Sequence, residues 1–245
     1  MKKKILLGIG IGFLLVLVLV FVVLGFFLGD VVKTGINTVG PRVTQTALSV
    51  DSVGVRPLLG WVSLNNFILG NPQEYLAKAT NAISVGKVAV SVEPFSVLSD
   101  KIVVKNLEVH DAVIDFVGNP IGANNLKKIQ DNVNAFTGGA KPAGTNAPAK
   151  PAGEKPAKKL EVDNILITGA KVRFNGTTLP LPDIHLTDLG KGKDGITPAE
   201  LFADILDQIS LGTVKAIAGS VGDAGKAIGD EATKAAKSIE NIFKK

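Results

Sequence analysis

The chain has no cysteine among its 245 residues. It can therefore form no disulfide bond, no zinc–thiolate site and no cysteine nucleophile, and it offers no thiol for lipoprotein acylation. Aromatic residues make up only 5% of the chain, and the net charge of +5 comes without a basic stripe interleaved with aromatics. Because nucleic-acid binding usually relies on such a stripe, we expect no nucleic-acid partner.

Polar residues are also missing from one long block near the start. Ile5–Leu28 contains no charged or polar side chain, and a helix needs about 20 apolar residues to cross roughly 30 Å of hydrocarbon. The alternative is a cleaved secretory signal, whose apolar region is about 7–15 residues and precedes a small-residue cleavage site. The block is longer, and Gly25–Asp30 offers no such site. We predict an uncleaved transmembrane helix over residues 5–29.

Charge predicts how this helix is oriented. Three lysines at residues 2–4 precede it, whereas only Asp30 and Lys33 follow closely. Because flanking lysines stay on the cytoplasmic side, the short segment 1–4 is expected in the cytoplasm and the rest of the chain outside. In a bacterium with two membranes, this describes a single-pass inner-membrane protein with a periplasmic C-terminal domain.

Two glycine pairs in the apolar block have the spacing of helix-dimerisation motifs. They are Gly8/Gly12 and Gly25/Gly29, and small residues four apart let two membrane helices approach closely. Such pairs are common by chance in apolar helices. Self-association is therefore an alternative use of this helix, not the leading expectation.

Most of residues 30–136 is expected to form the first part of a β-rich domain. A helical stem over Val31–Val39 precedes it, and Pro41 is predicted to end that stem. Glu74–Ala82 is a short helical candidate. The predicted strands Ile102–His110 and Ala112–Val117 are expected to form a hairpin across Asp111. The predicted strands are Arg42–Val50, Ser52–Arg56, Trp61–Leu69, Ser84–Val92, Ile102–His110 and Ala112–Val117.

A change of composition divides the domain. Residues 137–159 are nearly all Ala, Pro, Gly, Lys, Thr and Asn, which predicts a flexible linker because they can bury too little surface to order themselves. Residues 160–190 are expected to complete the domain, with a tight turn at Asn175-Gly176. The strands predicted there are Leu160–Thr168, Ala170–Asn175 and Thr178–His185.

Helices are expected at two further places. Asn124–Phe136 has apolar residues at spacings of three and four, with Asn124 or Asn125 as its cap. Residues 191–245 form a C-terminal helical region that opens with a capping box over Thr197–Glu200. Within it, Thr213–Phe243 has a thin, Ala-rich apolar stripe. That amphipathic segment lies either on a lipid surface or, as slightly favoured, on protein.

The two histidines are the best candidates for catalysis or metal binding. His110 could pair with Asp111 and Asp115, and His185 with Asp183 and Asp188. Neither shows a ligand spacing such as H-x-x-x-H. We interpret both as exposed polar residues at strand ends, and we predict no enzyme activity, no metal and no cofactor.

A series of short segments resembles a known family. They are Leu64–Pro72, Gly86–Val90, Ser96–Val104, Leu107–Val109, Asp115-Phe116, Asn124–Leu126 with Ile129-Gln130, and Leu179–Gly190. Together they are similar to the small, membrane-anchored relatives of the AsmA-like family of Gram-negative envelope proteins. The resemblance implies an inner-membrane helix and a periplasmic β-rich domain. Large members resemble bridge-like lipid-transfer proteins whose curved sheet forms an apolar groove. This chain is shorter, which favours a local or accessory role.

These observations predict an α+β fold with a mostly antiparallel sheet and a C-terminal amphipathic helix. The leading functional hypothesis is an envelope protein that contacts or carries lipid, in outer-membrane assembly or lipid homeostasis. The alternative is a scaffold that binds other envelope proteins and has no lipid groove. The expected partners are membrane lipids, other envelope proteins or a second copy. The candidate lipid-facing residues are Val88, Val90, Val92, Val103, Leu107 and Val109.

Overall fold

The computed structural model describes residues 23, 25, 27–137, 158–192 and 194–220. Most of the predicted transmembrane segment, nearly all of the predicted linker and the tail after residue 220 lie outside the described residues. Among the helices in the described ranges, none is both long and apolar enough to cross a membrane. The described residues have the predicted α+β fold with a mostly antiparallel sheet; the sheet is mixed, and three α-helices accompany it.

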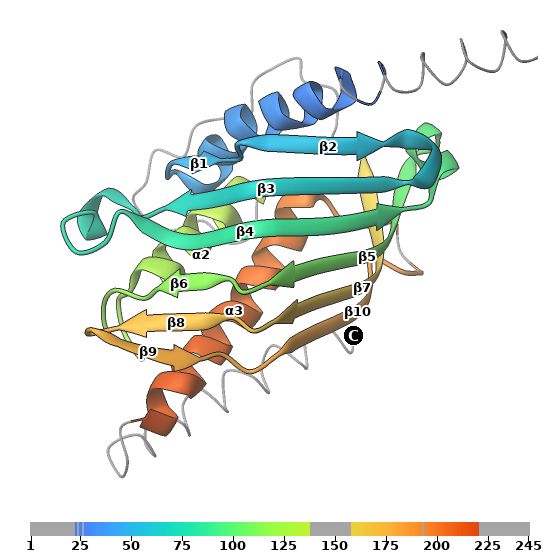
Figure 1. The fold of residues 1–245 in the computed structure, drawn as a ribbon. Helices are drawn as coiled ribbons and strands as arrows, with labels where there is room; N and C mark the ends of the chain where they lie inside the picture. Colours follow the sequence, from blue (N-terminus) through green and yellow to red (C-terminus); the bar gives the residue numbers. More distant parts are fainter. Residues whose placement is uncertain (1–22, 24, 26, 138–157, 193, 221–245) are drawn as a thin grey trace, which may run out of the picture.

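A single ten-stranded sheet organises the chain (Figure 1). The edge strands β1 and β2 pair with β3, and β3 pairs with β4 in a long antiparallel hairpin. Beyond β4, strands lie end to end in pairs. β5 and β6, for example, follow each other along β4 and both pair with it. The strands are β1 (Leu48–Ser49), β2 (Ser52–Arg56), β3 (Trp61–Gly70), β4 (Asn81–Val92), β5 (Lys101–His110), β6 (Val113–Asp115), β7 (Lys159–Thr168), β8 (Lys171–Phe174), β9 (Thr177–Pro180) and β10 (Ile184–Leu189).

The parallel pairs in this sheet follow from one long connection. β5 pairs with β7 and β6 pairs with β8 in parallel, whereas the outer strands β9 and β10 return antiparallel. Parallel neighbours need a crossover of a dozen or more residues. The helix α2 (Asn125–Thr137) and the segment 138–157 provide it.

The predicted hairpin across Asp111 is wrong. β5 and β6 do not pair with each other; they lie end to end along β4. A hairpin needs a turn of at least two residues, and Asp111 alone is too short to form one. Asp111 instead has a left-handed backbone (φ 53°) and separates β5 from β6. Gly169 (φ 65°) interrupts the neighbouring row beside it, where an added Cβ would lie 2.8 Å from a carboxylate oxygen of Asp111.

An α-helix that runs through residue 44 precedes the sheet, so the prediction that Pro41 ends it is wrong. Proline removes one backbone donor, but near the last turn that loss can be tolerated. The amide of Gln45 still donates to the carbonyl of Pro41 at 2.9 Å. The predicted strand Arg42–Val50 is correspondingly reduced to β1. The asparagine Asn37 pins this helix to the strands through bonds to the backbone of Val50 at 2.8 and 3.3 Å.

The glycines Gly25 and Gly29 pack this helix closely against β2. A Cβ on Gly25 would lie 2.7 Å from the carbonyl oxygen of Val55, and one on Gly29 would lie 2.3 Å from that of Val53. Both distances are below any normal contact, so only glycine permits this approach. One of the two glycine pairs with dimerisation spacing, Gly25/Gly29, therefore serves a contact inside the chain; Gly8/Gly12 lies outside the described residues.

Three local predictions need adjustment and three are confirmed. The candidate helix Glu74–Ala82 is only a short 3-10 turn, η2 (Gln73–Tyr75), before β4. The predicted strand Thr178–His185 is split between β9 and β10. The helix α3 (Pro198–Ser220) runs through Thr213 without a break. Confirmed features are the N-cap Asn124, the turn at Asn175-Gly176 and the reciprocal capping bonds between Thr197 and Glu200.

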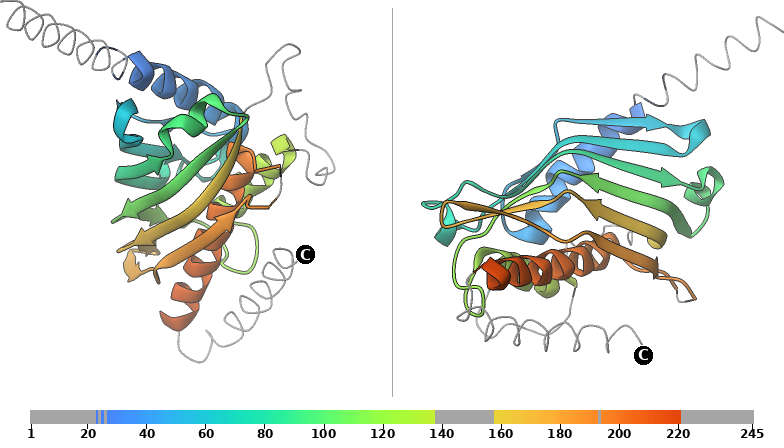
Figure 2. Two further views of the ribbon diagram at one scale, coloured as in Figure 1. Left: turned by 90° about the vertical axis from the view of Figure 1, so that its right-hand side faces the viewer. Right: turned by 60° about the horizontal axis from the view of Figure 1, so that its bottom comes forward.

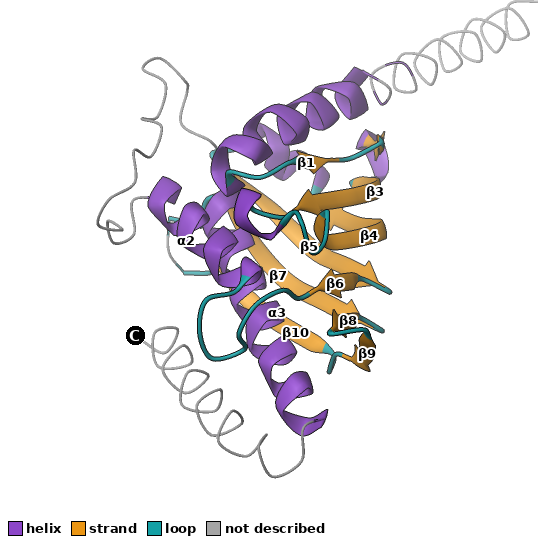
Figure 3. Ribbon diagram, turned by 90° about the vertical axis from the view of Figure 1, so that its left-hand side faces the viewer, coloured by secondary structure: helices purple, strands orange, loops and turns teal. Residues whose placement is uncertain are grey.

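The helices α2 and α3 lie on one side of the sheet, called here the inner face (Figures 2 and 3). They pack against each other, and α3 also contacts β8, β9 and β10. The core between helices and sheet is aliphatic and well buried, with Leu69, Ile114, Ile129, Val162 and Leu206 at 1% exposure or less. Burial of such side chains is the main source of stability here.

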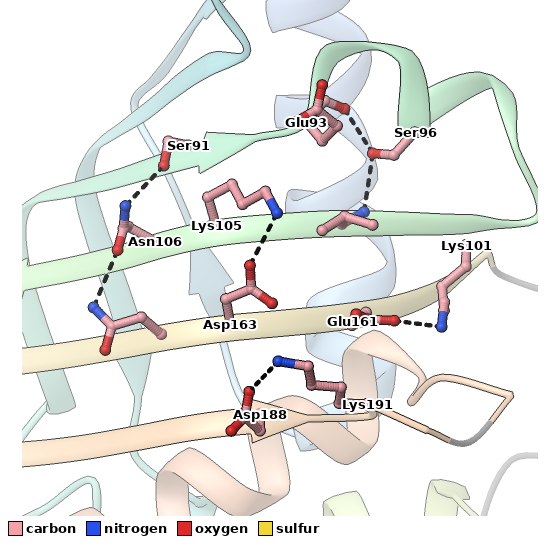
Figure 4. A network of polar contacts seen from close by, with 12 residues as sticks. Ser91, Glu93, Ser96, Lys101, Lys105, Asn106, Glu161, Asp163, Asp188 and Lys191 are labelled. Carbon is pink, nitrogen blue, oxygen red and sulfur yellow. Dashed lines mark hydrogen bonds and ion pairs between the residues drawn. The ribbon is translucent and has the colours of Figure 1, made fainter.

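The opposite, outer face is polar. Cross-strand pairs join β4, β5, β7 and β10 there, including Lys105 with Asp163 at 3.0 Å and Asn106 with Ser91 at 3.4 Å (Figure 4). Lys101 also pairs with Glu161. A sheet with one polar and one apolar face alternates along each strand. Any apolar ligand must therefore meet the inner face or the ends of the sheet.

Candidate lipid-contact site

The register of β4 and β5 brings five of the six candidate valines and leucines together on the inner face. Val88 pairs with Val109, Val90 with Leu107, and Val92 with Val104. Val103 is adjacent to Val104 in the same strand, so its side chain points to the opposite face. Val103 therefore does not share the surface that the sequence assigned to it, and Val104, 6% exposed, takes that place.

Coverage of this surface falls along the strands. Val88 and Val109 belong to the buried core, whereas Val90, Val92 and Leu107 are only partly buried. The partly buried rows lie toward the end of the sheet that carries η1 (Pro57–Leu59) and η3 (Pro94–Leu98), called here the tip. The inner face is therefore more accessible at Val90, Val92 and Leu107 than at Val88 and Val109, although Val104 is buried opposite Val92.

That opposite end, called here the closed end, is sealed by a network of buried asparagines. The side-chain amide of Asn125, fully buried at the start of α2, donates to Asn71 Oδ1 and to the carbonyl of Asp115, both at 2.7 Å. Its Oδ1 accepts from the amide of Val117 at 3.0 Å. Asn71 in turn donates to two backbone carbonyls of the β3–β4 connection. Paired in this way, the buried amides leave no polar group to be solvated.

A further buried asparagine ties the helices together. Asn132 in α2 donates to the carbonyl of Thr44 at 2.8 Å, at the end of the first helix. The sequence suggested Asn124 or Asn125 as a helix cap and Asn71 as part of a family pattern, but the hydrogen bond between Asn71 and Asn125 was not predicted. An asparagine in a run of apolar residues is a signal for such a role, because a buried amide must find partners.

The helix α3 carries two half-buried carboxylates toward its start. Burial raises the pKa of Asp204 to about 6, with repulsion from Asp207 and Glu200 adding to it. Burial alone raises the pKa of Asp207 to about 6. By contrast, the hydrogen bond from the Thr197 amide lowers the pKa of Glu200. The stability of α3, which covers part of the inner face, is therefore expected to depend on pH.

A polar hollow of about 410 Å³ lies at the closed end, beside the ends of β6 and β8. Its lining includes the ion pair between Asp115 and Arg173, with 2.6 Å between Oδ1 and Nε. Sites for acyl chains are lined mainly by apolar side chains. This hollow is therefore not a candidate for the predicted lipid contact.

The histidines do not assemble a reactive centre in the described part of the chain. His110, the last residue of β5, bonds through Nδ1 to Thr168 Oγ1 at 2.8 Å and lies 3.8 Å from Glu108. His185 bonds to Asn164 on the outer face. Across the residues that the structure describes, no group of three or more histidine, cysteine and acidic residues could hold a metal ion.

Comparison with known proteins identifies the family of this chain. No curated protein and no solved structure matches the chain. The model of the AsmA family matches residues 1–183, which include both inner-face valine strands and the buried asparagines. That family comprises non-catalytic envelope proteins and is linked to outer-membrane assembly. A match over this much of the sequence shows that the chain belongs to the AsmA family.

Proposed function

We propose that this protein is anchored in the inner membrane by residues 5–29 and that its periplasmic sheet contacts membrane lipid, in outer-membrane assembly or lipid homeostasis. The observation that carries the proposal is the partly buried row of Val90, Val92 and Leu107 on the inner face. Apolar side chains in such a row gain from covering by acyl chains, because contact with lipid removes them from water.

The direction of the first helix supports this reading. Its described turns run along β2 from Val53 toward Pro57 as the chain is followed back toward the apolar block. Gly25, near the end of the apolar block, therefore lies beside Pro57 at the tip. Lipid from the anchoring membrane would reach Val90, Val92 and Leu107 before it reached the closed end.

Site-specific photocrosslinking tests the proposal directly. A photoreactive amino acid at Leu107 or Val90 of the full chain, irradiated in native membranes, is expected to give phospholipid adducts detectable by mass spectrometry. The same amino acid at Asn106 or Ser91 is the matched control, because these neighbours lie on the outer face. Equal yields at both pairs, or adducts at neither, would remove the lipid contact.

A second function, an envelope scaffold, is favoured by a different observation. At the closed end, Leu69, Ile114 and Val172 are completely buried and α3 packs on β8 and β9, as expected for a sheet that needs no ligand to complete its core there. This hypothesis predicts stable protein partners in crosslinked pull-downs of the full chain. Protein adducts in place of lipid adducts at Leu107 would favour it.

A further inference from the structure

The tip carries an apolar surface formed by two neighbouring connections. η1 joins β2 to β3 and η3 joins β4 to β5, and the two contact each other at the same end of the sheet (Figure 1). Their large side chains face solvent: Leu58 is 61% exposed, Leu59 65%, Phe95 80% and Leu98 82%. Trp61, the first residue of β3, follows η1 and is 48% exposed; it pairs with Ser91 and so lies at the outer-face side of the tip. Scattered exposed apolar residues are ordinary, but a contiguous group on two adjacent loops marks an interaction surface.

Hydrogen bonds hold this surface in a defined shape. The amide of Val92 donates to the carbonyl of Gly60 at 2.7 Å, which joins the two connections. Gly60 is left-handed (φ 62°), and an added Cβ would lie 2.0 Å from the carbonyl oxygen of Val92. Within η3, Ser96 Oγ donates to the carbonyl of Glu93 at 2.6 Å and accepts from the amide of Val103 at 2.9 Å. With the backbone paired internally, the apolar side chains remain outside.

The position of the tip identifies its occupant. The first helix passes within contact distance of η1, since a Cβ on Gly25 would lie 3.6 Å from Pro57 Cδ. Gly25, near the end of the apolar block, thus lies beside the tip. A surface at this place faces the bilayer that receives the block.

The chemistry of the tip also fits a bilayer surface. Tryptophan is typical of the boundary between head groups and acyl chains, where its ring is apolar and its N–H is polar. A cation lies at the rim, because Lys158 Nζ donates to the carbonyls of Val97 and Ser99 at 2.6 and 3.0 Å. Lysine near an apolar patch attracts anionic lipid head groups.

We propose that the tip, defined by Leu58, Leu59, Trp61, Phe95 and Leu98, inserts into the interfacial region of the periplasmic leaflet of the anchoring membrane. This inference rests on the proposed anchor but goes beyond it, because an anchored chain could hold its domain clear of the surface. Insertion places the accessible rows of the inner face next to lipid.

The chain provides its own probe, because Trp61 is its only tryptophan. The full chain is reconstituted in vesicles of phosphatidylethanolamine and phosphatidylglycerol, and its Trp61 emission is measured with and without phospholipids brominated near the head-group end of the acyl chain. The expected result is emission shifted to shorter wavelength, loss of most of its intensity with brominated lipid, and protection from aqueous acrylamide.

Variants separate the tip from the rest of the surface. Phe95→Ser with Leu98→Ser is expected to restore acrylamide quenching of Trp61 and abolish quenching by brominated lipid. The matched control is Leu76→Ser with Ile121→Ser, which removes exposed apolar side chains in the connections at the closed end and is expected to leave Trp61 unchanged.

The outcomes distinguish the two proposals. If the chain does not float with the vesicles, the anchor itself is wrong and the proposed function fails with it. If the chain floats but Trp61 is quenched by acrylamide and not by brominated lipid, the anchor stands and the tip insertion is overturned. Short-wavelength emission without lipid quenching would show that protein covers the tip, which also overturns the insertion.

Discussion

The two ends of the sheet differ in which groups they bury and which they expose. At the closed end, asparagine amides are buried and fully paired while the apolar residues around them are out of solvent. At the tip, backbone groups pair internally while Phe95 and Leu98 stand in solvent. Leu76 and Ile121 are also exposed in the connections of the closed end, at 40% and 59%, but the most exposed large apolar side chains, Phe95 and Leu98, lie at the tip. The difference agrees with the proposal that the tip contacts the membrane, whereas the closed end serves stability.

The largest expected effect is a loss of folding stability at the closed end. Asn125→Ala removes three side-chain hydrogen bonds and leaves the buried Asn71 Oδ1 and the Val117 amide without that partner. Because unpaired buried groups retain their full desolvation cost, the loss of stability should be about 2–4 kcal/mol. Urea unfolding of the full chain in mild detergent, followed by circular dichroism, measures it.

Asp131→Ala in the same helix is the control for that variant, because Asp131 is exposed. Its unfolding midpoint should stay close to that of the wild type. A change in Asn125→Ala no larger than in the control would show that the closed end does not depend on the asparagine network.

The next effect concerns the joint between the first helix and β2. Gly29→Val places a side chain where even a Cβ would lie 2.3 Å from the Val53 carbonyl oxygen, so the helix must move, at a cost of roughly 1–3 kcal/mol. Gly35→Ala is the matched control, because nothing lies within 4 Å of an added Cβ there. The control should stabilise the helix by up to about 1 kcal/mol. Thermal unfolding in detergent compares the two; equal midpoints would contradict the close packing.

A smaller effect tests the cover that α3 provides between the two ends. The raised pKa values of Asp204 and Asp207, both about 6, mean that the folded state favours their protonated forms. Their contribution to stability is complete below the ordinary pKa of 3.8 and is lost as the pH rises through 6. Asp204→Asn with Asp207→Asn should raise stability at pH 7.5 by on the order of 1 kcal/mol, discounted for partial exposure.

The same pair of substitutions should change little at pH 4, where the wild-type carboxyls are already largely protonated. Unfolding midpoints at the two pH values provide the comparison. A stabilisation of the same size at both pH values would assign the effect to something other than protonation.

The smallest effect belongs to the outer face, which should matter to neither end. Lys105→Ala breaks the exposed pair with Asp163, and exposed ion pairs contribute about 0.2–1 kcal/mol. Membrane quenching of Trp61 should be unaffected. A clear loss of lipid quenching in Lys105→Ala would show that the outer face takes part in contact.

Local sequence patterns were sufficient for most strands and caps. Alternation located β4 and β5, and the capping box located the start of α3, because these signals depend on neighbours in the chain. The run past Pro41 and the in-line arrangement of β5 and β6 could not be predicted, because both depend on what packs alongside. Val103 was misassigned because irregular pairing near Val92 shifts the register between β4 and β5 by one residue.

The candidate surfaces show the same limit. Val88, Val90 and Val92 share a face because of period two, which the sequence displays directly. The tip was not predicted, because leucine and phenylalanine also form the core. Only the three-dimensional structure shows that Leu58, Phe95 and Leu98 are exposed. The asparagine network joins residues more than 50 positions apart, a pairing that no local pattern encodes.

The contact of Gly25 and Gly29 with β2 has a mechanical consequence. A domain joined through a flexible linker could move far from its membrane. A helix packed directly on a strand forms a stiff joint, so the tilt of the helix sets the tilt of the sheet. The longest strand, β4, has 12 residues and spans about 40 Å. If residues 5–29 anchor the chain as proposed, a single copy would work within that distance of the bilayer, and lipid contacted at its surface would need another molecule to travel further.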